Sequence, residues 1–381
     1  MLSEIFEKKE KKVEYIELIY DLIFVYIIGR NNSLLHHFDG GFVGLQTFLI
    51  YALCTLAVIQ IWSFTTFYIN MFGKNSAREY IFLFINMYLL YFIAQSTRSN
   101  AENFLTQYHI AWGLILVNVA VQYLIELFTR KKDGESFGVA KNMCFTLIFE
   151  AVIVFIAAFS SVLVCVILSY VAVASGIILT IFSRGKNSSI QIDFTHLSER
   201  IMLYVVFTFG EMIIAISSYF EGNGKWNTSL IYFSLMAFLI VAGLFLSYGF
   251  VYDNLIDREG SFNGMLYMII HIFIIFALNN ITVSLEFMRE EEIDLIPKMI
   301  FLVASLILYF VFLLGLKGHA KCNCKPKKSF ILSNCAAALI FIVLMIVFRE
   351  NMAVNIFVSV LFVYTVFLIL YFSYRKLKEK N

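Results

Sequence analysis

Charged residues and prolines are scarce in this sequence of 381 residues. Only 15 per cent of the residues are Asp, Glu, Lys or Arg, whereas 60 per cent are hydrophobic and 41 are phenylalanine. A soluble protein of this length could not bury so much apolar surface. The two prolines, Pro297 and Pro326, both lie between long apolar runs, so we expect helices that are not broken by proline at a binding site. The composition therefore predicts a multi-pass membrane protein that contacts the lipid bilayer.

Several signals of other protein classes are also missing. A net charge of +2 and the lack of a basic tract with interleaved aromatic residues argue against nucleic-acid binding. The six cysteines are scattered, and Cys322 and Cys324 lack the second pair that a zinc site needs. No phosphate-binding glycine loop, nucleophile elbow or His-Glu-x-x-His sequence occurs. We therefore expect no cofactor, no metal and no enzymatic activity, and the sequence leaves the oligomeric state open.

Apolar runs long enough to span a bilayer, about 20 residues each, occur twelve times. The charged start, Met1 to Lys12, is not followed by a small-residue cleavage site, so we expect the first run to stay in the protein. The sequence predicts an all-α membrane helix bundle with about twelve transmembrane helices. These lie at about 14–31, 43–71, 79–97, 106–128, 139–159, 162–182, 197–219, 228–252, 263–287, 298–316, 329–348 and 352–373.

The distribution of Lys and Arg predicts how these helices are oriented. If the N-terminus lies in the cytoplasm and the connections alternate, most of the 29 basic residues fall on the cytoplasmic side. Such a bias is typical of cytoplasmic loops. We therefore expect a protein of the cell membrane with both termini in the cytoplasm.

Weak internal similarity suggests that the chain is a duplicated six-helix unit. Tyr68 and Asn70 end the second apolar run, and Tyr252 and Asn254 end the eighth at the same spacing. Because six is an even number, two such copies would cross the membrane in the same direction, as the halves of a major facilitator do. The predicted repeats are residues 1–190 and 191–381.

Three acidic residues lie at the start of the first apolar run: Glu14, Glu17 and Asp21. Their spacing of three and four residues places them on one side of a helix. An ionised carboxylate at the centre of a membrane helix costs roughly 2.5 kcal/mol or more. These acids therefore need a counter-charge or water, and we expect Glu17 and Asp21 to be functional and Glu14 to lie at the membrane surface.

A second polar cluster opens the seventh apolar run. His196 and Arg200 are four residues apart, Glu199 precedes Arg200, and Glu211 follows almost three helical turns after Arg200 on the same face. A guanidinium binds carboxylates with two parallel hydrogen bonds, so we predict that Arg200 pairs with the acids of the first helix. The alternative is that these residues only anchor helix ends at the membrane surface.

Other polar residues within apolar runs are weaker candidates. Tyr252 and Asp253 close the eighth run, and Asp253 could equally be a solvated loop residue. Glu150 lies deep in the fifth run, where acids are functional candidates. His271 lies in the middle of the ninth run, where a lone histidine more often joins two helices than binds a ligand. Amides and acids that join helices or line a pathway are Asn86, Asn118, Gln122, Glu126, Asn279 and Asn280.

The residues at these clusters resemble the low-temperature-requirement A (LtrA) family of bacterial membrane proteins. Glu17-Leu-Ile-Tyr-Asp21-Leu-Ile-Phe-Val is similar to the E-L-F-F-D-L-V-F-V opening of that family. His196-Leu-Ser-Glu199-Arg200 and Phe209-Gly210-Glu211 resemble its H-x-x-E-R and L-G-E motifs. Further likenesses are Trp62, Thr66, Tyr68 and Asn70, which resemble its tryptophan-rich second helix, and Tyr252-Asp253, which resembles Y-F-D without the Phe. The resemblance implies a membrane protein linked to growth at low temperature, with no established reaction or substrate.

Three functions fit the sequence. The first is a secondary transporter or permease of an ion or small solute, with its polar centre at Glu17, Asp21, Arg200 and Glu211, because proton and ion relays use such residues. The second is a membrane-embedded enzyme that acts on a lipid or lipid-linked substrate, with His196 and the carboxylates in acid–base roles. The third is a structural or signalling protein whose charges only hold helices together.

Overall fold

Helices make up almost all of the chain that the structure describes. The structure is a computed structural model, and it describes residues 12–36, 38–97, 101–129, 135–183, 192–217, 227–258, 264–288, 290, 292–321 and 328–378. Cys322, Cys324 and Pro326 lie outside these residues.

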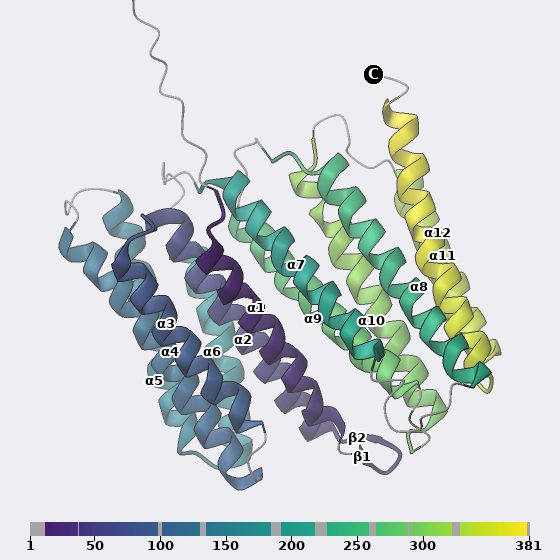
Figure 1. Cartoon of the computed structure of the whole chain (residues 1–381), viewed down its shortest axis with the longest axis horizontal. Coiled ribbons are helices and arrows are strands. Elements are labelled where there is room, and N and C mark those ends of the chain that lie inside the picture. Colours follow the sequence, from purple (N-terminus) through teal and green to yellow (C-terminus); the bar gives the residue numbers. More distant parts are fainter. Residues whose placement is uncertain are drawn as a thin grey trace, which may run out of the picture. The chain divides into compact units, whose positions relative to one another are not determined.

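The predicted class, an all-α bundle of membrane helices, is confirmed (Figure 1). The described residues form twelve α-helices, and eleven are long and apolar enough to cross a membrane; α1, with 17 residues, is shorter. The helices are α1 (Tyr15–Asn31), α2 (Leu45–Phe72), α3 (Ala77–Ser96), α4 (Ala101–Thr129), α5 (Glu135–Ala158), α6 (Val162–Ser183), α7 (Phe194–Ser217), α8 (Thr228–Phe250), α9 (Gly264–Phe287), α10 (Leu295–Gly315), α11 (Lys328–Val347) and α12 (Met352–Lys378).

Short elements connect some of these helices. They are the 3₁₀ helices η1 (Asn32–His36) and η4 (Leu316–His319), the π-helical turn η3 (Val251–Leu255), and the strands β1 (Phe38–Asp39) and β2 (Phe42–Val43). The two strands form an antiparallel hairpin. Its turn contains Gly40 and Gly41, both with positive φ, a conformation that glycine adopts without steric cost.

Local chemistry explains where several helices begin. Asn227 precedes α8, and its side chain accepts the backbone N–H of Leu230 at 2.7 Å, which satisfies one of the free donors of the first turn. Pro297 lies in the first turn of α10, where its missing N–H removes no bond within the helix. The sequence predicted that this helix begins at residue 298, so Pro297 was expected in the preceding connection; the helix begins three residues earlier, at Leu295.

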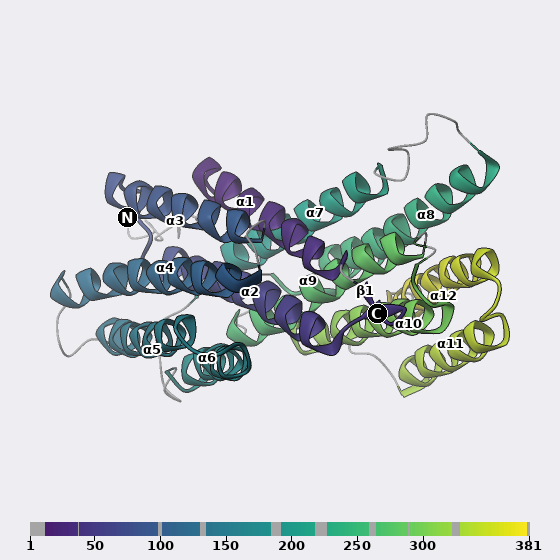
Figure 2. The same ribbon diagram turned by 90° about the horizontal axis from the view of Figure 1, so that it is seen from below.

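The chain divides into two compact units. The first comprises Met1–Ile27, Leu56–Tyr204 and Arg258–Met265, and the second comprises Ile28–Thr55, Val205–Asp257 and Leu266–Asn381. Helices α1, α2, α7 and α9 thus contribute residues to both units. In the first unit α4 packs against α3 and α5, and α5 against α6; in the second, α12 packs against α8 and α11 (Figure 2). These units describe packing, and the predicted sequence duplication stays a prediction.

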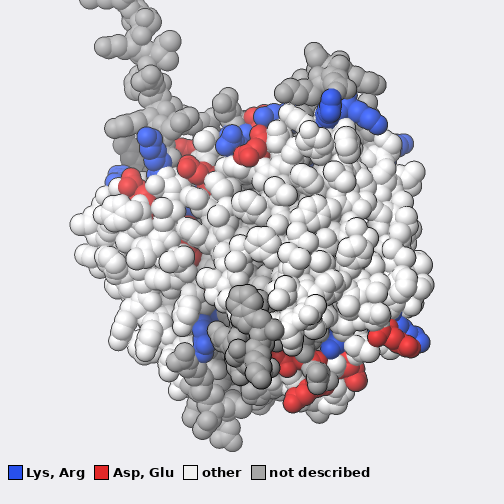
Figure 3. All heavy atoms as spheres, turned by 45° about the vertical axis from the view of Figure 1, so that its right-hand side comes forward, with Lys and Arg blue, Asp and Glu red and all other residues white. Residues whose placement is uncertain are grey.

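The surface of the protein has the character of a membrane protein. On the face drawn in Figure 3, charged side chains gather near the ends of the helices and are sparse between them. Large apolar side chains are exposed on many helices, for example Phe159, Phe182 and Leu163, each more than 70% exposed. Such side chains are favourable in contact with lipid, and a helix satisfies its own backbone hydrogen bonds in the bilayer.

Candidate functional site

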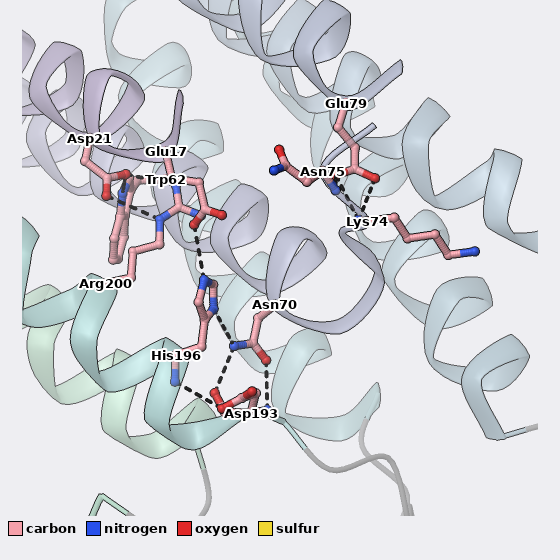
Figure 4. Close-up of polar contacts among 10 residues, drawn as sticks. All are labelled: Glu17, Asp21, Trp62, Asn70, Lys74, Asn75, Glu79, Asp193, His196 and Arg200. Carbon is pink, nitrogen blue, oxygen red and sulfur yellow. Dashed lines mark hydrogen bonds and ion pairs between the residues drawn. The ribbon is translucent and has the colours of Figure 1, made fainter. Parts of the chain in front are cut away.

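The first unit contains a buried cluster of charged side chains from α1 and α7 (Figure 4). Arg200 Nη2 and Nε donate to the two oxygens of Asp21, at 2.9 and 3.3 Å. Arg200 Nη1 lies 3.2 Å from Glu17 Oε2. The side chains of Arg200 and Asp21 are fully buried and that of Glu17 is 4% exposed. The predicted pairing between the first and seventh helices is therefore present.

Helical spacing brings these side chains together. Glu17 and Asp21 are four residues apart on α1, so that they lie one above the other on the same face. His196 and Arg200 have the same spacing on α7. His196 Nε2 lies 3.4 Å from Glu17 Oε2, so each acid of α1 faces one basic side chain of α7 and Arg200 reaches both acids.

Helix α2 completes the cluster with an indole. The Nε1–H of Trp62 donates to Asp21 Oδ1 at 2.7 Å. The guanidinium carbon of Arg200 lies 5.9 Å from the centre of the Trp62 ring, a cation–π distance. Asp21 thus receives one N–H from Trp62 and two from Arg200. Hydrogen bonds of this kind favour the ionised carboxylate.

Asn70, two turns after Trp62 on α2, fixes the tautomer of His196. Asn70 Oδ1 accepts the backbone N–H of Asp193 at 3.1 Å, and its Nδ2 donates to the Asp193 carbonyl at 2.9 Å. The same Nδ2 lies 3.2 Å from His196 Nδ1. Because Nδ2 can only donate, His196 Nδ1 is an acceptor and carries no proton. The ring nitrogen that faces Glu17 is Nε2.

The N-terminus of α7 is held at the same place. Asp193 Oδ1 accepts the backbone N–H of His196 at 3.0 Å, which is the hydrogen bond of an N-cap. Asn70 therefore connects the end of α2 to the start of α7, and positions His196 and, one turn later, Arg200.

The turn between α2 and α3 is fixed by another acid, Glu79, which forms a separate group of contacts in Figure 4. Glu79 accepts the backbone N–H groups of Lys74 and Asn75, at 2.8 and 2.9 Å. Asn75 has a φ of 54°, in the left-handed region that asparagine tolerates better than most residues. Each carboxylate oxygen of Glu79 accepts a hydrogen bond from the turn, so Glu79 stabilises the turn.

Two polar networks of the first unit join α1 and α2 to α3 and α4. Tyr20, next to Asp21, hydrogen-bonds Thr65 at 3.0 Å and accepts Asn86 Nδ2 at 3.2 Å. Asn118 of α4 donates to Asn86 at 2.7 Å. In the second network, Arg78 of α3 pairs with Glu126 of α4 at 2.7 Å, and Tyr68 of α2 donates to the same carboxylate. These amides and acids join helices, one of the two roles expected for them.

Of the other residues selected from sequence, Glu199 and Glu211 lie outside the ion-pair cluster. Glu199 is half-buried and forms none of the ion pairs found among the described residues. Glu211 lies on the part of α7 that belongs to the second unit, and its carboxylate packs against Gly29 of α1. The expectation that Glu211 shares a site with Arg200 rested on helical spacing alone, and the two residues fall in different units.

Three more selected residues lie in the second unit. Asp253, in the π-helical turn η3, is exposed, and Tyr252 is buried with its ring stacked on Tyr248 at 6.4 Å. His271 of α9 is fully buried: Nδ1 lies 2.8 Å from the Tyr267 carbonyl and Nε2 lies 3.2 Å from the Tyr248 hydroxyl. These bonds join α9 to α8, which is the structural role expected for a lone membrane histidine.

Sequence reasoning did not select Trp62 and Asn70 as site residues, although it noted both in the family resemblance. A signal for them was present, because Trp62, Thr66 and Asn70 recur every four residues and lie on one face of α2. Polar groups that line one face of an apolar helix indicate a polar partner on the neighbouring helices.

The fold and the buried cluster define a multi-pass helical membrane protein with a buried carboxylate–arginine cluster. The family described as bacterial low temperature requirement A protein (LtrA) matches residues 12–371 of this chain. The chain therefore belongs to the LtrA family. No curated protein and no solved structure matches it.

Proposed function

We propose that the protein is a secondary transporter that uses the Glu17–Asp21–Arg200–His196 cluster to bind a proton or a small cation during its cycle. One observation carries the proposal: two buried carboxylates share one guanidinium, and Nδ1 of the neighbouring His196 faces an amide donor. When both acids are ionised, two of the four side chains carry a negative charge and one, Arg200, carries a fixed positive charge. Burying an unmatched charge is costly, so a proton or cation is the favoured addition.

Glu17 is the member that can accept this charge most easily. Asp21 is held as a carboxylate by three N–H donors from Arg200 and Trp62. Protonating His196 on Nδ1 would require Asn70 to turn its amide round and lose both bonds to Asp193. The Glu17 carboxylate lies 3.2 Å from Arg200 Nη1 and 3.4 Å from His196 Nε2, so a proton or cation bound there stays next to both side chains of α7.

Reconstitution into lipid vesicles tests the proposal. The full-length protein is placed in vesicles that contain a pH-sensitive dye, and Na⁺ or K⁺ is added outside with a membrane potential imposed. We expect wild-type protein to move protons or the added cation, and Glu17→Gln to abolish this movement. Glu199→Gln is the matched control, because it removes a carboxylate on the adjacent helix outside the ion-pair cluster. Equal fluxes in wild type and Glu17→Gln would refute the proposed centre.

A second function, a structural charge lock, is favoured by the burial of the cluster. The side chains of Arg200, Asp21 and His196 are fully buried, as expected if they only hold α1, α2 and α7 together. A double-mutant cycle on Asp21 and Arg200 separates the two functions. Coupling in stability, with transport unchanged in the variants that still fold, would support the lock and exclude the transport centre.

The proposal includes the cellular setting. We propose that both termini lie in the cytoplasm, and that transport by this protein underlies the growth at low temperature that the family name implies. Fusing a reporter that is active only in the cytoplasm to either terminus tests the orientation. Growth of a deletion strain at low temperature, complemented by wild type and not by Glu17→Gln, tests the connection to the cold.

A further inference from the structure

A second buried carboxyl group of the first unit lies outside the charged cluster. Glu150 of α5 is fully buried, and Gln60 Nε2 of α2 donates to its Oε2 at 3.4 Å. The same Nε2 donates to the Val173 carbonyl of α6 at 3.1 Å, which fixes the amide with its oxygen turned away from that carbonyl. Gly176, one turn further along α6, leaves room where a Cβ atom would collide with Glu150 and Gln60.

Two buried acceptor atoms of this group have no hydrogen-bond donor among the described residues. They are Glu150 Oε1 and Gln60 Oε1, and both are inaccessible to solvent. A proton on the Glu150 carboxyl group would add a hydrogen-bond donor beside these two acceptor atoms. Buried polar groups in folded proteins are nearly always satisfied, so this deficit points to a bound species with positive charge or a donor hydrogen.

No cation of the described chain compensates Glu150. On α4 and α6, which pack against α5, the titratable side chains that the structure describes are Tyr108, His109, Tyr123, Glu126, Cys165 and Tyr170. Helix α2 contributes the neutral Gln60. Among these, only Gln60 bonds to Glu150. His109 is held by Ser169 and Leu105, and Glu126 by Arg78.

We infer that Glu150 and Gln60 form a second proton-binding site, in which the Glu150 carboxyl group is protonated at neutral pH and exchanges its proton with solvent. The physical reason is the contrast with Asp21. Asp21 has a guanidinium and an indole N–H beside it, whereas Glu150 has one long hydrogen bond from a neutral amide. An isolated carboxylate at membrane depth is far less favourable than the neutral acid.

Carbodiimide labelling tests this site without depending on transport, so its failure can be told apart from failure of the proposed function. Dicyclohexylcarbodiimide reacts with protonated carboxyl groups in apolar surroundings. The full-length protein in lipid nanodiscs is treated across a neutral-to-alkaline pH series, and labelled peptides are identified by mass spectrometry. We expect label on Glu150 that declines as the pH rises and is the same in sodium and choline buffers. Glu126, paired with Arg78, is the internal control and should stay unlabelled.

Infrared spectroscopy decides the case in which the reagent does not reach the site. We expect a C=O stretching band of a protonated carboxylic acid that shifts in D₂O and is lost in Glu150→Gln. Spectra of wild type and Glu150→Gln without such a difference would overturn the inference, as would a band that does not shift in D₂O. Labelling suppressed by sodium at constant pH would also overturn it, and would show a metal-cation site instead.

Discussion

Removing the arginine of the charged cluster should destabilise the protein more than removing either of its acids. Arg200 is the one cation shared by Glu17 and Asp21, and its side chain is fully buried. Arg200→Gln removes the guanidinium that these two buried carboxylates share. In Asp21→Asn, by contrast, the charges of Arg200 and Glu17 still match, and the amide that replaces the carboxylate keeps an oxygen that can accept from Trp62 and Arg200.

The expected magnitudes follow from these contacts. Breaking a buried ion pair by removing one partner costs about 3–5 kcal/mol in the free energy of unfolding, which we expect for Arg200→Gln. Weakening hydrogen bonds to a charged group costs about 1.5–3 kcal/mol, which we expect for Asp21→Asn. The double variant should be less destabilised than the sum of the two, because neutralising Asp21 removes part of the repulsion that Arg200→Gln creates.

Unfolding of the full-length protein in mixed detergent micelles, followed by tryptophan fluorescence and circular dichroism, measures these differences. Arg200→Lys is the control for geometry: it keeps the charge and loses the planar fork that reaches Asp21 through two nitrogens, so it should fall between wild type and Arg200→Gln. If Arg200→Gln and Asp21→Asn cost the same, or if the double variant shows simple additivity, the charge-matching argument is wrong.

Two further predictions concern other parts of the chain. Gly176→Ala should lower the free energy of unfolding by about 1–3 kcal/mol because the new Cβ meets Glu150. Gly138→Ala on α5 has open space around it, so it should be neutral or raise stability by about 1 kcal/mol at most, through the helix propensity of alanine. Unfolding by denaturant measures both variants against wild type. His36, between α1 and α2, hydrogen-bonds Glu286 at 3.3 Å, and this bond raises the pKa of His36 above its usual value. Its contribution to stability should be complete below the usual histidine pKa of about 6.5 and disappear as the pH rises through the raised pKa, so the difference in melting temperature between wild type and His36→Gln should vanish in alkaline buffer.

The sequence identified the helices well because their signal is local. Each apolar run needs only its own composition and length to be recognised, and the twelve predicted runs correspond to α1–α12 with end points that differ by a few residues. Charges at the loops and the near absence of proline reinforced the same boundaries. The family motifs could also be recognised from the sequence, because each is a contiguous stretch of residues.

The charged cluster was predictable in part. Glu17 and Asp21 on one face of a helix, and Arg200 as their partner, follow from helical periodicity and from the cost of an unpaired charge in the membrane. Periodicity also grouped Glu211 with Arg200; the two residues fall in different units, and their shared role stays a prediction. Spacing along one helix cannot show which neighbour that helix meets at each level.

The sequence by itself determined that this is a helical membrane protein of the LtrA family with costly charges at defined places. Only the tertiary structure decided how those charges are compensated. It brought Trp62 to Asp21, used Asn70 to fix the tautomer of His196, and left Glu150 with a neutral amide in place of a cation. These outcomes depend on contacts between helices far apart in sequence, and a charge, a tautomer or a bound proton is set by the groups within a few ångströms.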